Sequence, residues 1–335
     1  MERIDALRNW LTQVRPDLDE TLQPASSDAS FRRYFRVHGG NGETFIIMDA
    51  PPAQEDVRPW IDIAARLAEA GVCVPEIHAH DAEQGFILMS DLGTTTYLDA
   101  LTPANAAALY ADALGTLIAL QHCPEAHTLP AYSRELLEHE LRLFDTWYVE
   151  RHKATHLDAH EREGLERVYA RLLDTHLAEP RVFVHRDYHS RNLMHRGAGQ
   201  PPGLIDFQDA VFGPISYDLV SLFKDAYILW DEEFVLDLLV RYWETARDLG
   251  LPVRPDFGDF LHDYDWMGVQ RHLKVLGVFA RVHHRDGKSV YLDDMPRVLH
   301  HLRRTCQRYS ELKPLLRILD RLDPEEVGLT YGYTF

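Results

Sequence analysis

Hydrophobic and polar residues follow two different patterns along the chain, and the first occupies about 90 residues. Short runs rich in aromatic and β-branched residues predict strands over 34–37, 44–48 and 86–89. Apolar residues at helical spacing predict helices over 3–14 and 59–71. The glycine-rich segment 38–42 joins the first two runs and predicts a hairpin. This part of the sequence therefore predicts a small β-rich lobe over residues 1–92.

Long helical patterns dominate after Gly93. Apolar residues recur every three or four positions over 103–121, 134–152, 158–178, 216–229, 231–249, 258–285 and 295–319. Short strand-like segments interrupt this pattern between Val182 and Phe207. We therefore predict an α+β fold with two lobes, in which residues 93–335 form the larger, mainly helical lobe. A cleft between such lobes is a favoured site for ligands.

The most informative polar segment is His-Arg-Asp-Tyr-His-Ser-Arg-Asn at 185–192. Asp187 and Asn192 share this segment, and Asp206 follows nineteen positions after Asp187. A hairpin over 196–203 would fold Asp206 back against the first two residues. Phosphoryl transfer needs oxygen ligands for Mg²⁺ and a carboxylate that orients the attacking hydroxyl. The spacing H-R-D-x-x-x-x-N followed by D-F is typical of a kinase catalytic loop and metal-binding segment.

Charge and cysteine content restrict the partners and the compartment. The chain has 53 acidic and 35 basic residues, a formal net charge of −18, which disfavours nucleic acid and anionic membranes as partners. Its apolar runs are too short for a membrane helix, and its start lacks a secretory signal. The separated Cys73, Cys123 and Cys306 favour free thiols in the cytoplasm over a disulfide framework. No feature indicates an obligate protein partner.

With these residues in place, the sequence resembles the aminoglycoside phosphotransferase and choline kinase family along nearly its whole length. The resemblance implies a protein-kinase-like fold with ATP and Mg²⁺ in the cleft. It implies that Asp187 is the catalytic base and that Asn192 and Asp206 are the metal ligands. Asp218 matches a buried acid that braces the catalytic loop in that family, and His185 is expected to brace the same loop by hydrogen bonding.

The resemblance also implies a nucleotide site in the small lobe. The turn from Ser26 to Tyr34 resembles the nucleotide loop of the family, so Ser27 and Ser30 are expected near the phosphates. The residues expected at the hinge, where backbone atoms bind adenine, are Met89, Ser90, Asp91 and Leu92.

One departure from the family pattern concerns the cation that holds the phosphates. Kinases of this shape use a strand lysine paired with a helix glutamate, whereas the first lysine of this chain is Lys153. Arginine grips phosphate oxygens in a fork, so Arg32, Arg33 and Arg36 are the candidate replacements, with Arg33 preferred and Glu55 as the candidate helix partner. The missing lysine also leaves open a non-catalytic nucleotide-binding protein.

Several segments resemble more narrowly the bacterial kinases that phosphorylate the anomeric hydroxyl of N-acetylmuramate and N-acetylglucosamine in cell-wall recycling. These segments are 27–36, 48–52 and 266–274. This resemblance implies an amino-sugar substrate and a sugar α-1-phosphate product. A kinase of an aminoglycoside, choline or another small amine or alcohol remains the alternative.

The expected acceptor contacts combine aromatic and charged side chains. Aromatic side chains stack on sugar rings, and cations meet a carboxylate. The candidates are Trp147, Tyr148, Asp209, Trp230, Arg271 and His272.

Overall fold

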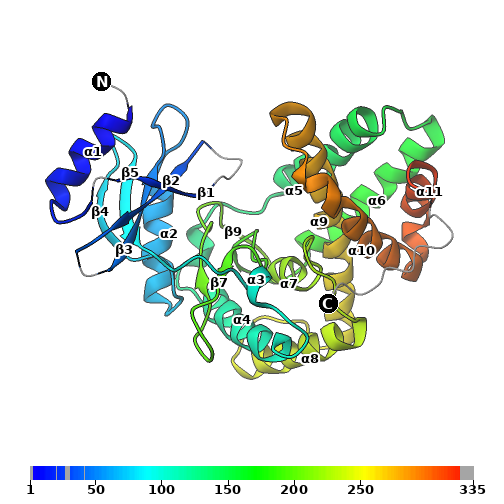
Figure 1. The fold of residues 1–335 in the computed structure, drawn as a ribbon. Helices are drawn as coiled ribbons and strands as arrows, with labels where there is room; N and C mark the ends of the chain where they lie inside the picture. The colour runs from blue at the N-terminus through cyan, green and yellow to red at the C-terminus, as the bar shows by residue number, and fades with distance from the viewer. Residues whose placement is uncertain (1–2, 20, 27–30, 41, 325–335) are drawn as a thin grey trace.

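The computed structural model describes residues 3–19, 21–26, 31–40 and 42–324 (Figure 1). The small lobe is built on a five-stranded antiparallel sheet with strand order β1-β2-β3-β5-β4. The strands are β1 (Gln23–Ser26), β2 (Arg33–His38), β3 (Thr44–Asp49), β4 (Ile77–Asp81) and β5 (Phe86–Ser90). The predicted hairpin over 34–48 is present, as β2 pairs with β3 from Arg33↔Asp49 to His38↔Thr44.

Each face of this sheet is covered by one helix, because alternate residues of a strand point to opposite faces. Helix α1 (Arg3–Val14) packs Leu7, Trp10 and Leu11 against one face. Helix α2 (Arg58–Glu69) packs against the other face, which carries Met48 and Ile87 (Figure 1). The buried residues on the α2 side continue into the core of the large lobe, so the two lobes share one hydrophobic core.

Helices form most of the large lobe. Its α-helices are α3 (Tyr97–Ala100), α4 (Ala106–Gln121), α5 (Arg134–Leu143), α6 (Ala159–Leu177), α7 (Tyr217–Phe223), α8 (Glu232–Asp248), α9 (Phe257–Asp286), α10 (Met295–Arg308) and α11 (Lys313–Leu322). A π-helix covers Phe144–His152, and 3₁₀ turns cover Ala126–Thr128, Val290–Asp294 and Ser310–Leu312. The long helix α9 lies at the centre and packs against α5, α6, α7, α10 and the π-helix. No helix in the described ranges is both long and apolar enough to cross a membrane.

Two small strand pairs lie in the large lobe near the sheet of the small lobe (Figure 1). Strand β6 (Arg181–Val184) pairs with β9 (Val211–Pro214), and β7 (Leu193–Met194) pairs with β8 (Gly203–Leu204). The chain runs from β6 through residues 185–192 into β7, and from β8 through Asp206 into β9. The polar residues singled out in the sequence therefore occupy the two connections between these pairs.

Three of the predicted helices differ from the structure. The stretch 134–152 is divided, because the α-helix gives way to a π-helix at Phe144. The stretch 295–319 is broken around Tyr309, and Pro314 lies in the first turn of α11, where a missing N–H costs no hydrogen bond. Helix α7 already ends at Phe223, after which Asp225 accepts a hydrogen bond from the amide of Tyr227 (3.0 Å).

Candidate active site

His185 connects the two polar segments. Its buried ring accepts a hydrogen bond at Nδ1 from the amide of Asp187 (3.2 Å), and its Nε2 lies 3.1 Å from the carbonyl oxygen of Ile205. A carbonyl only accepts, so the neutral tautomer with its proton on Nε2 satisfies both contacts. Burial lowers the pKa of His185 to about 4, which favours this neutral form. His185 thus fixes Asp187 next to the segment that carries Asp206.

Asn192 and Asp206 are brought together by the short β7–β8 pair. Leu193 pairs with Leu204, and the amide of Ile205 donates to the carbonyl oxygen of Asn192 (3.2 Å). The side-chain nitrogen of Asn192 donates to the backbone oxygen of Asp187 (2.9 Å). This bond directs the amide nitrogen inward and leaves the side-chain oxygen as an acceptor.

The backbone is strained on both sides of this arrangement. Arg186 has φ 74° and Asp206 has φ 63°, in the left-handed region that non-glycine residues rarely adopt. Such a conformation costs about 1–3 kcal/mol and persists only where the surroundings enforce it. Here the surroundings include Asp218, whose carboxylate accepts the amides of His185 (2.7 Å) and Arg186 (3.0 Å). This is the bracing contact expected of Asp218.

Asp187 lies beside cations from helix α9. About 40% of its side chain is exposed, and its carboxylate lies 3.5 Å from Arg271. Desolvation by the surrounding protein would raise the pKa of Asp187, but the charges of Lys274 and Arg271 outweigh it and lower the pKa. Arg271 also donates a hydrogen bond to the backbone oxygen of Arg186 (2.7 Å). It therefore fixes the backbone next to Asp187 and also stabilises the negative charge of the Asp187 carboxylate. The carboxylate is therefore ionised at neutral pH and positioned by α9.

A buried glutamate, which the sequence pattern did not single out, organises these cations. Glu140 of α5 accepts from Arg186 (2.5 Å), Lys274 (3.1 Å) and Gln270 (3.0 Å), and also from the Tyr132 hydroxyl. Burial would raise the pKa of Glu140, but Lys274 and Arg186 lower it to about 2. In the sequence, Glu140 is one of several acids in an amphipathic helix. Its position three residues after Leu137, on the same apolar face of α5, was the available signal.

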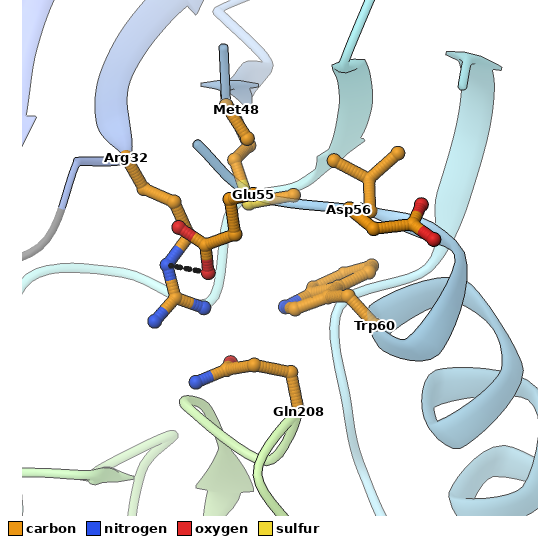
Figure 2. A pocket seen from close by; sticks show the side chains of 8 residues that line it. Arg32, Met48, Glu55, Asp56, Trp60 and Gln208 are labelled. Atoms are coloured by element: carbon orange, nitrogen blue, oxygen red, sulfur yellow. Dashed lines mark ion pairs between the residues drawn. The ribbon is translucent and has the colours of Figure 1, made fainter. Parts of the chain in front are cut away.

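The structure reverses the expected order of the two arginines. Arg32 lies in the cleft, with its Nε 3.2 Å from Glu55 and a terminal nitrogen 3.5 Å from Asp206. Figure 2 shows Arg32 and Glu55 paired at a small pocket that Met48, Trp60 and Gln208 also line. Met48 comes from the strand where the family carries its lysine. The arginine beside Asp206 is therefore Arg32.

Arg33 points to the other side of the strand, as alternation along β2 requires. Its Nε lies 3.0 Å from Asp49, and the same carboxylate accepts a hydrogen bond from Arg3 (2.7 Å). Asp49 is fully buried beneath these two arginines. The structure does not support the preference for Arg33, because its guanidinium ties β2 to β3 through Asp49, whereas Arg32 lies beside Asp206.

The residues expected at the hinge lie at the end of β5 and directly after it. Asp91 forms a two-pronged ion pair with Arg36 of β2 (2.5 and 3.1 Å) and accepts the amide of Gly93 (2.9 Å). Ser90 is bonded through its amide and hydroxyl to Glu76 (2.9 and 2.8 Å). Met89 is buried in the shared core, and Leu92 packs against Gly203. Asp91 and Ser90 thus have side chains committed within the small lobe, and a nucleotide contact here would use backbone atoms. The expected loop residues Ser27 and Ser30 lie outside the described residues.

The acceptor candidates are divided by the structure. Tyr148 is fully buried and donates to Asp323 (2.6 Å), and His272 is buried with its Nε2 3.1 Å from the carbonyl oxygen of Lys224. The expectation that these two residues contact substrate was therefore wrong, because core packing seals them from the cleft. Trp230 is partly buried and donates to the hydroxyl of Tyr110 (2.7 Å).

The remaining candidates lie closer to solvent or to Asp187. Asp209 lies three residues after Asp206 and is exposed. Its carboxylate accepts a hydrogen bond from the side chain of Gln208 (3.2 Å). Trp147 is partly buried on the π-helix. Arg271 lies against Asp187, as described above.

Two lobes around a braced Asp-Asn-Asp arrangement define the protein-kinase-like class of phosphotransferases. Solved structures of that class resemble this chain in fold. An ADP-bound aminoglycoside phosphotransferase, APH(2'')-Ib, gives a TM-score of 0.58 at 14% identity over 89% of this chain and 97% of its own. The choline kinase of Streptococcus pneumoniae gives 0.62 at 12% identity over 89% and 98%.

Sequence comparison identifies the family. The model of the phosphotransferase enzyme family matches residues 21–251, and the chain belongs to that family. The N-acetylmuramate/N-acetylglucosamine kinase of Pseudomonas aeruginosa is 48% identical over 331 residues, covering 96% of this chain and 97% of its own. The protein of the same name from Neisseria meningitidis serogroup B is 45% identical over 340 residues and all of both chains.

Proposed function

We propose that this protein transfers the γ-phosphoryl group of ATP to the anomeric hydroxyl of N-acetylmuramate and N-acetylglucosamine. The observation that carries the proposal is the gathering of Asp187, Asn192 and Asp206 in a full-length relative of kinases named for these two sugars. The product is the sugar α-1-phosphate, and its formation serves cell-wall recycling in the cytoplasm. The substrate is a small molecule, and neither nucleic acid nor a membrane takes part.

In this reaction the anomeric oxygen attacks the γ-phosphorus, forming an O–P bond, while the bond to the bridging oxygen of ADP breaks. Asp187 orients the hydroxyl and accepts its proton. An anomeric hydroxyl is more acidic than an ordinary alcohol, so a carboxylate of low basicity suffices. Catalysis then comes mainly from positioning and from neutralising charge.

The donor atoms at the site fit Mg²⁺. Asn192 offers its side-chain oxygen and Asp206 a partly exposed carboxylate, and both are hard oxygen ligands of the kind Mg²⁺ takes alongside phosphates. When bound there, the ion would neutralise charge on the β- and γ-phosphates. Arg32 would hold the phosphates in place of the usual lysine, and its pairing with Glu55 fixes the guanidinium toward Asp206. Adenine would lie against the backbone of residues 89–92.

A panel of acceptors in an ADP-coupled assay tests the proposal. N-acetylmuramate and N-acetylglucosamine should each give Mg²⁺-dependent ADP release, whereas choline and kanamycin should give rates close to the background. Turnover confined to an amine-bearing acceptor would move the assignment to the aminoglycoside or choline branch of the family. The presence of Asp187, Asn192 and Asp206 argues against a protein that only binds nucleotide. Mg²⁺-dependent ADP release with any acceptor would exclude that alternative.

A further inference from the structure

Helix α9 presents three basic residues along one side. Arg271 and Lys274 lie next to Asp187 in the candidate active site. Arg281 lies seven residues beyond Lys274. Seven residues turn an α-helix through about 700°, only about 20° short of two full turns, so the two side chains leave the helix in nearly the same direction. Their separation along the helix axis is about 10 Å. The side of α9 that carries Lys274 beside Asp187 therefore carries a second cation, Arg281, two turns farther along.

Arg281 differs from the other two because its charge is poorly compensated. Its Nε is buried and has no hydrogen-bond partner within the described ranges. Asp286 is the acid that acts on it, but Arg285 already holds that carboxylate with two bonds (2.7 and 2.9 Å). Burial and the charge of Arg285 lower the pKa of Arg281. A partly buried guanidinium in this state is stabilised by an anion that supplies the missing acceptor.

The π-helix forms a wall beside this stretch of α9. Gln270 of α9 donates to Glu140 of α5, the helix that leads into the π-helix (3.0 Å), and farther along the ring of His152 lies 5.7 Å from that of His284. Trp147 belongs to the π-helix and is partly buried. The element that packs along this stretch of α9 therefore carries an aromatic residue.

We propose that Arg281 binds a carboxylate on the acceptor sugar and so favours N-acetylmuramate over N-acetylglucosamine. The inference rests on the proposed function. N-acetylmuramate differs from N-acetylglucosamine by a lactyl ether that carries a carboxylate several bonds from C1. With its anomeric hydroxyl at Asp187, a sugar that extends along α9 beyond Lys274 brings this group toward Arg281, which lies about 10 Å farther along the helix axis than Lys274. A guanidinium matches a carboxylate with two parallel hydrogen bonds.

The test compares both sugars in Arg281→Gln. The variant should lower kcat/KM for N-acetylmuramate about tenfold, mainly through KM, the size expected for losing a charged hydrogen bond. The same constant for N-acetylglucosamine should stay within about twofold, because that sugar has no carboxylate. Arg281→Lys keeps the charge and should retain part of the preference. Arg241→Gln is the control, since it removes an exposed arginine of α8 that is paired with Asp237 (2.8 Å), and it should change neither constant.

Two results overturn the assignment of Arg281: an equal loss with both sugars, or an unchanged constant for N-acetylmuramate. Thermal unfolding of each variant shows whether an equal loss comes from misfolding or from a general role of Arg281 in catalysis. In both cases Arg281 would not select between the two sugars. Failure of the wild-type protein to phosphorylate either sugar would overturn the proposed function and this inference together. Activity on both sugars without an effect of Arg281 would overturn this inference alone.

Discussion

Arg32 of the small lobe lies 3.5 Å from Asp206 of the large lobe. This contact spans 174 positions of the sequence and joins the lobes at the place where the phosphates of ATP are expected. Arg32 is also held by Glu55 at 3.2 Å. The pair of a cation and a glutamate found in related kinases is therefore present with a different cation, supplied by the residue that precedes β2.

Replacing Arg32 should weaken the handling of ATP. Arg32→Met removes the guanidinium, and we expect kcat/KM for ATP to fall by about 10- to 100-fold, since hydrogen bonds to charged groups contribute about 1.5–3 kcal/mol each. Arg33→Met is the matched control, because Arg33 binds Asp49 on the other side of the strand. Steady-state kinetics with varied ATP measure both. A larger effect in Arg33→Met than in Arg32→Met would restore the arginine preferred from sequence.

Removing the carboxylate of Asp187 should abolish turnover and leave ATP binding in place. General base catalysis contributes about 10²- to 10⁴-fold, so Asp187→Asn should reduce kcat by at least that range. Its side chain contacts Arg271 and carries none of the expected metal-ligand role, so nucleotide affinity should change little. Isothermal titration with ATP analogues and Mg²⁺ checks the second part. Unchanged kcat in Asp187→Asn would remove the proposed base.

The sequence predicted the parts of this site that depend on local spacing. Asp187, Asn192 and Asp206 were found because a loop, a short strand pair and a return segment fix their relation within twenty residues. The bracing role of His185 was predicted from its place in the same segment, whereas that of Asp218 was predicted only from the family resemblance. Helix α1 was predicted with its observed bounds, since its apolar positions repeat regularly.

Features that depend on contacts between distant segments were missed. Strand β1 was not predicted, because Pro24 and the serines after it are turn formers and only pairing with β2 makes this segment a strand. Glu140 could not be distinguished from a solvated acid until α9 packed against α5. The choice between Arg32 and Arg33 depended on the residue at which β2 begins, and the boundaries of elements are the least certain part of a prediction from sequence.

Glu140 should be essential for stability. Glu140→Gln removes the charge that compensates Arg186 and Lys274 in a buried site. Breaking a buried ion pair at one side costs about 3–5 kcal/mol, so the free energy of unfolding should fall by that amount. Urea denaturation measures it. Glu138→Gln on the same helix is the control, because Glu138 forms an exposed pair with Arg142 and should change stability by less than about 1 kcal/mol. Equal free energies of unfolding in the two variants would show that the charge of Glu140 is not needed to stabilise buried Arg186 and Lys274.

Two buried histidines should make the protein sensitive to acid. Burial lowers the pKa of His272 to about 3 and that of His301, stacked on it at 5.3 Å, well below its ordinary value. Each pKa is lower in the folded than in the unfolded chain, so the unfolded chain binds more protons below pH 6.5. The stability contributed by keeping these rings neutral is complete above pH 6.5 and is lost as the pH falls toward 3.

The variant His301→Phe keeps the stacked ring and removes one titrating group. Between pH 6.5 and 5, the fall in unfolding free energy should become less steep by about 1 kcal/mol per pH unit on average, approaching about 1.4 kcal/mol per pH unit at lower pH. Urea denaturation at several pH values gives this slope. His156→Gln, at a side chain 80% exposed, should leave the slope unchanged. A slope in His301→Phe equal to that of the wild-type protein would mean that His301 takes up no extra proton on unfolding.

The most direct measurement is a phosphorus NMR spectrum of the product made from N-acetylmuramate, ATP and Mg²⁺. A kinase of the anomeric hydroxyl gives ADP and one new phosphomonoester signal, split by the single proton on C1. A signal coupled to the two protons on C6, or the absence of any sugar phosphate with both amino sugars, would contradict the account.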